Sequence, residues 1–196
     1  MKSIAKYLIV LGLSWLLSGC MKTENPAENP SAETQIRQRI AELYAKHGKS
    51  GDSIYSQAIS PDLFSADLKN LLQQVLEVTK ADQERIAKSE HPTDKPAILE
   101  GSIFSSLYEG PTAYTIQSIE IAESVKPLGA QATVRVAMEN TSVSPTITWT
   151  DSVHLVNAFD SGWRVSNISF VPEMAHAADL VGSLQTFISH SQRPLP

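Results

Sequence analysis

Apolar residues recur at helical spacing near the start of the chain, in the stretch "SAETQIRQRIAELYAKHG", residues 31–48. One face of this stretch collects Ile36, Ile40, Leu43 and Tyr44. That spacing predicts an amphipathic helix packed on a core. Ser31 is a suitable N-cap and Gly48 a suitable stop signal.

A second helical pattern runs from Ser60 to about residue 88. We expect Ser60 to cap it, with Pro61 in the first helical position, where proline is well tolerated. Its apolar stripe consists of Phe64, Leu68, Leu71, Leu72, Val75 and Leu76.

Proline and glycine then interrupt regular structure over residues 89–111. This stretch nevertheless carries six large apolar residues, namely Ile98, Leu99, Ile103, Phe104, Leu107 and Tyr108. A purely solvated loop would not contain so many. We therefore predict a long ordered loop that packs on the core, with one helical turn at "SIFSSL".

Four segments with alternating polarity follow, at residues 113–122, 131–140, 146–158 and 162–171. Alternation with period two predicts strands, and the short connections predict an antiparallel sheet. In the first segment Tyr114 and Ile116 should point inward, together with either Ile119 or Ile121, which requires a bulge. A last helical pattern covers residues 172–190.

This order predicts an α+β domain over residues 34–172, in which N-terminal helices pack on a curved antiparallel sheet of about four strands. Residues 173–196 add a C-terminal helix and a tail.

The first nineteen residues have a different character. Lys2 and Lys6 precede an eleven-residue apolar run, residues 7–17. Such a run covers about 16 Å as a helix, whereas a bilayer core of about 30 Å needs roughly 20 apolar residues. A charged start, a short apolar stretch and small residues are typical of a secretory signal peptide.

The end of this segment, Leu17-Ser18-Gly19-Cys20, resembles the lipobox of bacterial lipoproteins. The resemblance implies cleavage before Cys20 and a diacylglyceryl group on its thiol, followed by a flexible tether over residues 20–33. The alternative is an ordinary signal peptide that happens to contain a cysteine. Residue 21 is Met, and the family resemblance then implies an acylated protein of the outer membrane that faces the periplasm.

Charge and cysteine content narrow the possible functions. Removal of residues 1–19 leaves 177 of the 196 residues and, with Lys2 and Lys6 gone, changes the net charge from −5 to −7. An acidic domain is poorly suited to nucleic acid, which requires a basic surface. Cys20 is the only cysteine, so no disulfide is available within the chain.

The predicted order of elements resembles the cone-shaped nuclear-transport-factor-2-like fold. Three stretches, "SPDLFSADLKNLL", "EGSIFSSLYEGPTAYTI" and "VHLV" followed by "SGWRVSNI", resemble an uncharacterised family of exported bacterial proteins with that fold. That family has no established activity, so the resemblance implies a shape and not a reaction.

Local signatures of catalysis are missing from the part of the chain that follows the signal segment. There is no G-x-S-x-G, no phosphate-binding loop and no dinucleotide fingerprint. No cofactor is implied. His176 and Asp179 could share a helix face, but two ligands are too few for zinc. Glu90, His91 and Asp94 are interpreted as a solvated loop, so no metal site is predicted.

Asp151 and His154 are the best candidates for acid–base chemistry. Asp151 has the inward parity of Trp149 and Val153, and a carboxylate among apolar neighbours would have a raised pKa. His154 has the opposite parity. We expect Asp151 to lie at the strand edge or the mouth of the cone, where it meets water.

Aromatic residues could line a pocket between the helices and the sheet, although a filled core is the expected arrangement. The candidate pocket residues, with Asp151, are Tyr44, Phe64, Tyr108, Tyr114, Trp149 and Trp163.

Two functions remain open. The first is a lipid-anchored periplasmic protein that binds a small ligand or an envelope protein, one version being an immunity-type inhibitor of an incoming toxin. The loop at residues 89–111 would be a natural contact surface for it. The second is a small cone-fold enzyme, similar to an isomerase or a dehydratase, that uses Asp151 in an internal pocket. We favour binding over catalysis.

Overall fold

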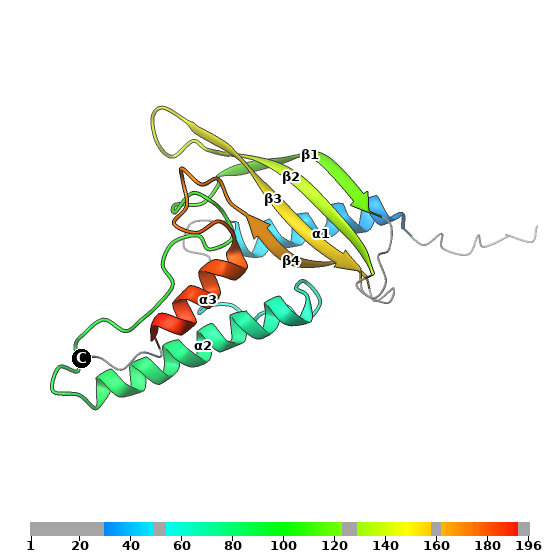
Figure 1. Cartoon of the computed structure of the whole chain (residues 1–196). Helices are drawn as coiled ribbons and strands as arrows, with labels where there is room; N and C mark the ends of the chain where they lie inside the picture. The colour runs from blue at the N-terminus through cyan, green and yellow to red at the C-terminus, as the bar shows by residue number, and fades with distance from the viewer. Residues whose placement is uncertain (1–29, 49–53, 123–128, 158–161, 192–196) are drawn as a thin grey trace, which may run out of the picture.

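The computed structural model describes residues 30–48, 54–122, 129–157 and 162–191. The lipobox and Cys20 lie outside these residues. The chain forms α1 (Ala32–His47), α2 (Ala66–Ala87), β1 (Ala113–Ala122), β2 (Ala130–Asn140), β3 (Ile147–Asn157), β4 (Arg164–Ser169) and α3 (Leu180–Ser191) (Figure 1). Within the described ranges, no helix is both long and apolar enough to cross a bilayer.

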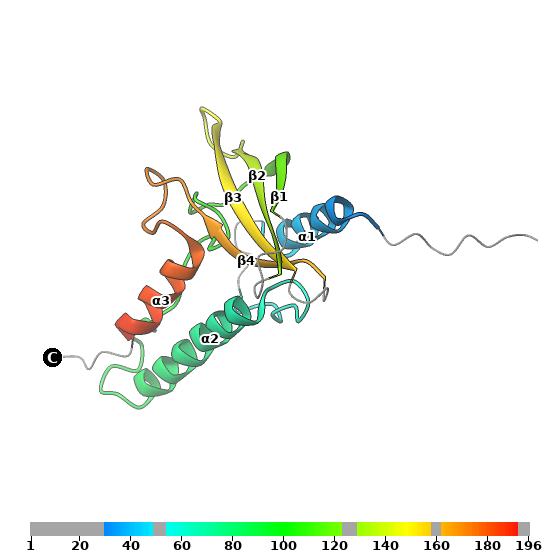
Figure 2. The same cartoon turned by 45° about the vertical axis from the view of Figure 1, so that its right-hand side comes forward.

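The four strands form one antiparallel sheet in the order β1-β2-β3-β4. Buried side chains from all three helices and from the inward-facing strand positions belong to a single core. α2 and α3 lie side by side, as both views show (Figures 1 and 2). The predicted α+β fold, with helices on an antiparallel sheet of four strands and an added C-terminal helix, is confirmed.

Alternation along β2 separates the two faces of the sheet. Val134, Val136 and Met138 are at most 2% exposed and point into the core, whereas Arg135 and Glu139, at the alternate positions, are exposed. We call the side that carries Arg135, Ala137 and Glu139 the outer face. The register of the sheet is set by this burial, because a slip by one residue would turn the apolar side chains from the core to the outer face.

The bulge predicted in β1 is present. The register shifts between Ile116 and Ser118, so that the inward alternation passes from Tyr114 and Ile116 to Ile119, which packs against the core. A bulge adds one residue to one strand of a pair and reverses the side-chain parity beyond it.

α1 begins as predicted, with the Ser31 hydroxyl accepting a hydrogen bond from Thr34 N at 3.2 Å. The predicted start of the second helix at Ser60 and Pro61 is wrong. α2 begins at Ala66, and Ser65 caps it by accepting from Leu68 N.

The reason for the later start lies in β4. Val165 N donates to Leu63 O, and Ser65 N donates to Val165 O, both at 2.8 Å. These two bonds, on either side of the β-bridge between Phe64 and Val165, hold residues 63–65 beside β4. Backbone groups that are paired with a neighbouring strand cannot form helical hydrogen bonds at the same time. The helix therefore begins only at Ala66.

The predicted start of the C-terminal helix at residue 172 is also wrong, because α3 begins at Leu180. Phe170 N donates to Ala178 O, and Ser169 forms a β-bridge with Asp179. The segment before α3 therefore loops back onto the end of β4. The Asp179 carboxylate accepts from Gly182 N at 2.7 Å and caps the helix that follows.

Residues 88–112 lack regular structure, as predicted, and their second half packs on the core. Phe104 is 1% exposed, and Ser105 and Ser106 are buried beside it. The helical turn predicted at "SIFSSL" is not formed. Instead, Ser102 N donates to Tyr108 O at 2.8 Å and closes a compact turn over these residues.

Candidate functional site

Asp151 lies in the middle of β3 and points into the core, with 0% of its surface exposed. The expectation that it meets water is wrong, while its predicted inward parity is confirmed. Its Oδ2 accepts from Ser106 N at 3.0 Å and from Trp149 Nε1 at 3.1 Å. Its Oδ1 accepts from the Ser106 hydroxyl. Three donors from the loop and the strand therefore satisfy this carboxylate.

Burial raises the pKa of Asp151, and the hydrogen bonds from Ser106 and Trp149 oppose that rise. The Ser106 hydroxyl also accepts from Val171 N at 2.8 Å. One short chain of hydrogen bonds therefore joins β3, the 88–112 loop and Val171, two residues after the end of β4. This arrangement suits a carboxylate that fastens a loop to a sheet.

Tyr44 lies close to this network, in contact with Tyr114, with ring centroids 4.8 Å apart. Its hydroxyl is buried and has no hydrogen-bond partner among the described residues. Burial raises the pKa of Tyr44 well above its ordinary value, and the negative charge of Asp151 adds to the effect. The hydroxyl is therefore neutral and able to donate.

The predicted pocket residues do not form one pocket. Phe64 stacks on Phe104 in the core, with ring centroids 5.6 Å apart, and Trp163 is 2% exposed. Tyr108 is 59% exposed and faces solvent. Side chains from α1, α2 and the sheet fill the interior, in agreement with the filled core that was expected there and not with the alternative of an internal pocket.

Tyr44 and Tyr114 do line an open groove between α1 and the start of β1. Its volume is about 380 Å³, and its other lining residues are Ala41, Ala45, Gly48, Pro111, Thr112 and Ala113. Apart from the two tyrosines and Thr112, the groove offers little polar chemistry.

His154 lies on the outer face, as its parity predicted. Its Nε2 is 2.8 Å from the Ser169 hydroxyl, and its Nδ1 is 3.3 Å from the Thr133 hydroxyl. Burial lowers the pKa of His154, and the charge of Asp179 opposes that change. The neutral ring therefore bridges neighbouring strands on the face of the sheet opposite to the fully buried Asp151.

The residues weighed as metal ligands are not assembled. Glu90, His91 and Asp94 are exposed in the loop. His176 and Asp179 precede α3, so the premise that they share a helix face is wrong. Across the described ranges, no three His, Cys, Asp or Glu side chains come together as a metal site would require.

A larger hollow, of about 480 Å³, lies over β1, β2 and β3. Ala137 stands directly between Thr115 on β1 and Thr150 on β3 in the strand register. Its methyl group leaves space where a longer side chain would fill the outer face. We call this feature the outer hollow; it is lined by Ala113, Tyr114, Thr115, Gln117, Ala137, Met138, Glu139, Thr148, Trp149 and Thr150.

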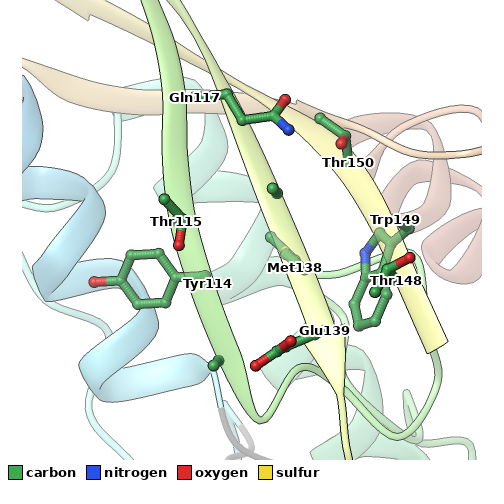
Figure 3. A pocket seen from close by; sticks show the side chains of 10 residues that line it. Tyr114, Thr115, Gln117, Met138, Glu139, Thr148, Trp149 and Thr150 are labelled. Atoms are coloured by element: carbon green, nitrogen blue, oxygen red, sulfur yellow. The ribbon is translucent and has the colours of Figure 1, made fainter. Parts of the chain in front are cut away.

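Polar side chains from β1, β2 and β3 surround the outer hollow (Figure 3). Gln117 and Thr150 extend from opposite sides, while Tyr114 points away towards α1. Sequence reasoning missed this feature, because outward positions of a strand are ordinarily solvated. The available signal was Ala137, a small residue at an outward position between two polar ones.

Comparison of the chain with models of known protein families found no match, and a search of curated proteins found none either.

Proposed function

We propose that this chain is a lipid-anchored protein of the cell envelope that acts by binding a partner on its surface. The anchor rests on the lipobox-like quartet that ends in Cys20. Binding at the surface rests on one contrast between two sites. The interior carboxylate, Asp151, is enclosed and satisfied, whereas the outer hollow is open and polar.

This contrast weighs against the enzyme alternative. A general base must come within hydrogen-bond reach of the proton that it removes. No surface of Asp151 is exposed, and its oxygens already accept from Ser106 and Trp149. A substrate would have to displace the loop that covers the carboxylate.

The outer hollow offers chemistry suited to recognition. Thr115, Thr148 and Thr150 supply hydroxyl groups, Gln117 an amide and Glu139 a carboxylate. Each hydroxyl or amide can donate and accept, so together they can pair with a polar chain without a fixed charge pattern. Glu139 adds a preference for a cationic group at one end.

The experiment is capture of partners from detergent-solubilised envelope with the full-length protein as bait. Ala137→Arg fills the floor of the hollow, while Gln131→Arg places the same side chain on the same strand and face, outside the residues that line the hollow. We expect Ala137→Arg to lose the captured partner and Gln131→Arg to keep it.

Capture that is equally strong with Ala137→Arg would remove the outer hollow as the binding site. Failure of the wild-type protein to retain any envelope component, after direct and cross-linked capture, would count against the proposed function itself.

A further inference from the structure

β1 is an edge strand. The sheet order places β2 on one side of it, and no described strand pairs with its other side. Its ten residues, "AYTIQSIEIA", include one charge, Glu120, and neither lysine nor proline. Natural sheets usually blunt a long edge with charges, proline or bulges, because its free backbone groups can pair with another strand. Here only a bulge is present.

On the core side of the sheet, side chains of β1 are less buried than the side chains of β2 that lie opposite them. Val134 and Ala132 of β2 are 0% and 3% exposed, and they lie opposite Ile119 and Ile121 of β1. Ile119 is only partly buried, and Ile121 is 45% exposed. Among the described residues, the apolar row therefore reaches the edge strand with Ile119 only partly covered and Ile121 exposed.

The bulge makes the pattern of β1 symmetric. Without a bulge, inward positions would follow a strict alternation along the strand. The register shift after Ile116 displaces the second half by one residue, so the inward positions are 114, 116, 119 and 121. This set reads the same in both directions about the midpoint between Gln117 and Ser118.

We propose that β1 pairs antiparallel with β1 of a second copy of this chain, across a two-fold axis at that midpoint. Tyr114 then lies opposite Ile121 of the partner subunit, and Ile116 lies opposite Ile119 of the partner subunit. All four of these positions face the core side. The two sheets join into one continuous sheet of eight strands.

The register is selective because a slip by one residue places inward side chains opposite outward ones. In the symmetric register, Glu120 lies opposite Thr115 of the partner subunit, so like charges do not meet. Cross-strand apolar pairs on the core side stabilise such a ladder, and the exposed Ile121 is covered. An isologous two-fold contact of this kind closes at two subunits.

Pairing also places the two outer hollows close to the same seam, because Thr115 and Gln117 belong both to β1 and to the lining of the hollow. The dimer does not depend on what the hollow binds. Its test is therefore separate from the capture experiment.

The first test is the mass of the full-length protein in density-matched detergent, by analytical ultracentrifugation. We expect a dimer for the wild type and a monomer for Ile121→Lys. Val143→Lys is the matched control, since Val143 is 41% exposed and belongs to the connection between β2 and β3, not to β1. A monomeric wild type at micromolar concentration, or a dimer that survives Ile121→Lys, would overturn the proposal.

The second test does not depend on a destabilising variant. Thr115→Cys in one copy and Glu120→Cys in a co-expressed, differently tagged copy should form a disulfide under mild oxidation, because directly opposed strand positions approach the separation that a disulfide needs. Thr115→Cys expressed alone should not cross-link, because positions 115 of the two copies are far apart in this register. Wild-type protein controls for the thiol of Cys20. Cross-linking of β1 only to another protein would overturn the dimer.

Discussion

At the scale of single residues, the carboxylate of Asp151, a candidate for acid–base chemistry, has a structural role. Its three hydrogen bonds come from Ser106 and Trp149, and all of its surface is enclosed. A buried carboxylate is tolerated only when donors replace the lost water. Because the donors are in place, the group fastens the loop to the sheet.

Replacement of Asp151 should therefore affect stability according to how many donors are left unpaired. Asp151→Ala leaves three donors without an acceptor and should lower the free energy of unfolding by about 3–5 kcal/mol. Asp151→Asn retains one acceptor and should cost about 1 kcal/mol. Urea denaturation measures both. Equal stability of Asp151→Ala and the wild type would show that the network is not structural.

The contribution of Asp151 to the stability of the fold should change with pH in one direction. Burial raises the pKa of Asp151 in the folded protein, whereas the unfolded chain keeps a value near about 3.9. As the pH falls through the raised value, the folded state takes up a proton that the unfolded state does not yet bind. The wild type should thus gain stability relative to Asp151→Asn as the pH falls from neutrality towards the unfolded-state value of about 3.9. A gap that narrows over this range would contradict the direction of the shift.

Two glycines share a positive φ but differ in the space that surrounds them. Gly101 and Gly162 both have positive φ, 73° and 88°, which costs other residues about 1–2 kcal/mol. A Cβ at Gly162 would meet nothing within 4 Å, but one at Gly101 would lie 2.5 Å from the Tyr108 ring and 2.8 Å from the Tyr108 carbonyl oxygen.

We expect Gly162→Ala to cost about 1 kcal/mol of unfolding free energy and Gly101→Ala about 3 kcal/mol or more, from conformational strain and steric overlap. Thermal denaturation of the two variants side by side measures the difference. Similar melting temperatures would mean that the turn over residues 101–108 adjusts easily.

At the scale of elements, side chains from outside the 88–112 loop hold its first half in place. The Asp82 carboxylate of α2 accepts from Ala97 N at 2.8 Å, and the Tyr55 hydroxyl accepts from Leu99 N at 2.9 Å. The hydrogen bond from Ala97 lowers the pKa of Asp82, with a further contribution from Arg85. The stabilisation from Asp82 is therefore present at neutral pH and is lost as the pH falls through that lowered value.

Asp82→Ala should release this part of the loop. Loss of a hydrogen bond to a charged acceptor costs about 1.5 kcal/mol or more, which corresponds to roughly tenfold faster local opening. Amide hydrogen exchange at Ala97 should accelerate by about that factor, while exchange in β2 and β3 stays unchanged. Uniform acceleration across the sheet would indicate global destabilisation instead.

At the scale of the whole molecule, the interior is a packed core, and the open polar space lies on the outer face of the sheet. This arrangement supports the proposal that the domain acts through what its surface presents. The proposed anchor at Cys20 then determines where that surface is available.

Cys20→Ala tests the anchor. If Cys20 carries acyl chains, the wild type should partition into the membrane pellet, because two or more chains hold a protein firmly. Cys20→Ala cannot be acylated there, and it should change its fractionation or remain as an unprocessed precursor of higher mass. Gel mobility and fractionation of the two proteins, with metabolic labelling by a fatty-acid analogue, measure this. Equal labelling of both would rule out Cys20 as the site of attachment.

Much of the fold followed from local patterns. Period-two alternation located all four strands, and the conflict between Ile116 and Ile119 located the bulge, because a bulge is the usual way in which a strand changes parity. Ser31 marked the start of α1 for an equally local reason, since a hydroxyl at the N-cap bonds a backbone N–H three residues away.

The helix starts that failed depended on distant residues. Ser60 and Pro61 are good local signals, but residues 63–65 pair with Val165, about a hundred positions later in the chain. Similarly, residues 170–179 fold back on β4 before α3 can begin. Backbone pairing with a strand outweighs a local helical preference of a few tenths of a kcal/mol per residue.

The sequence by itself determined the order of the elements, the two faces of each strand and the bulge in β1, because each of these depends on side chains a few positions apart. Only the tertiary structure decided that Asp151 is enclosed, since its donor Ser106 lies 45 residues away. It also decided where open space remains, because Thr115, Ala137 and Thr150 become neighbours only through the register of three strands.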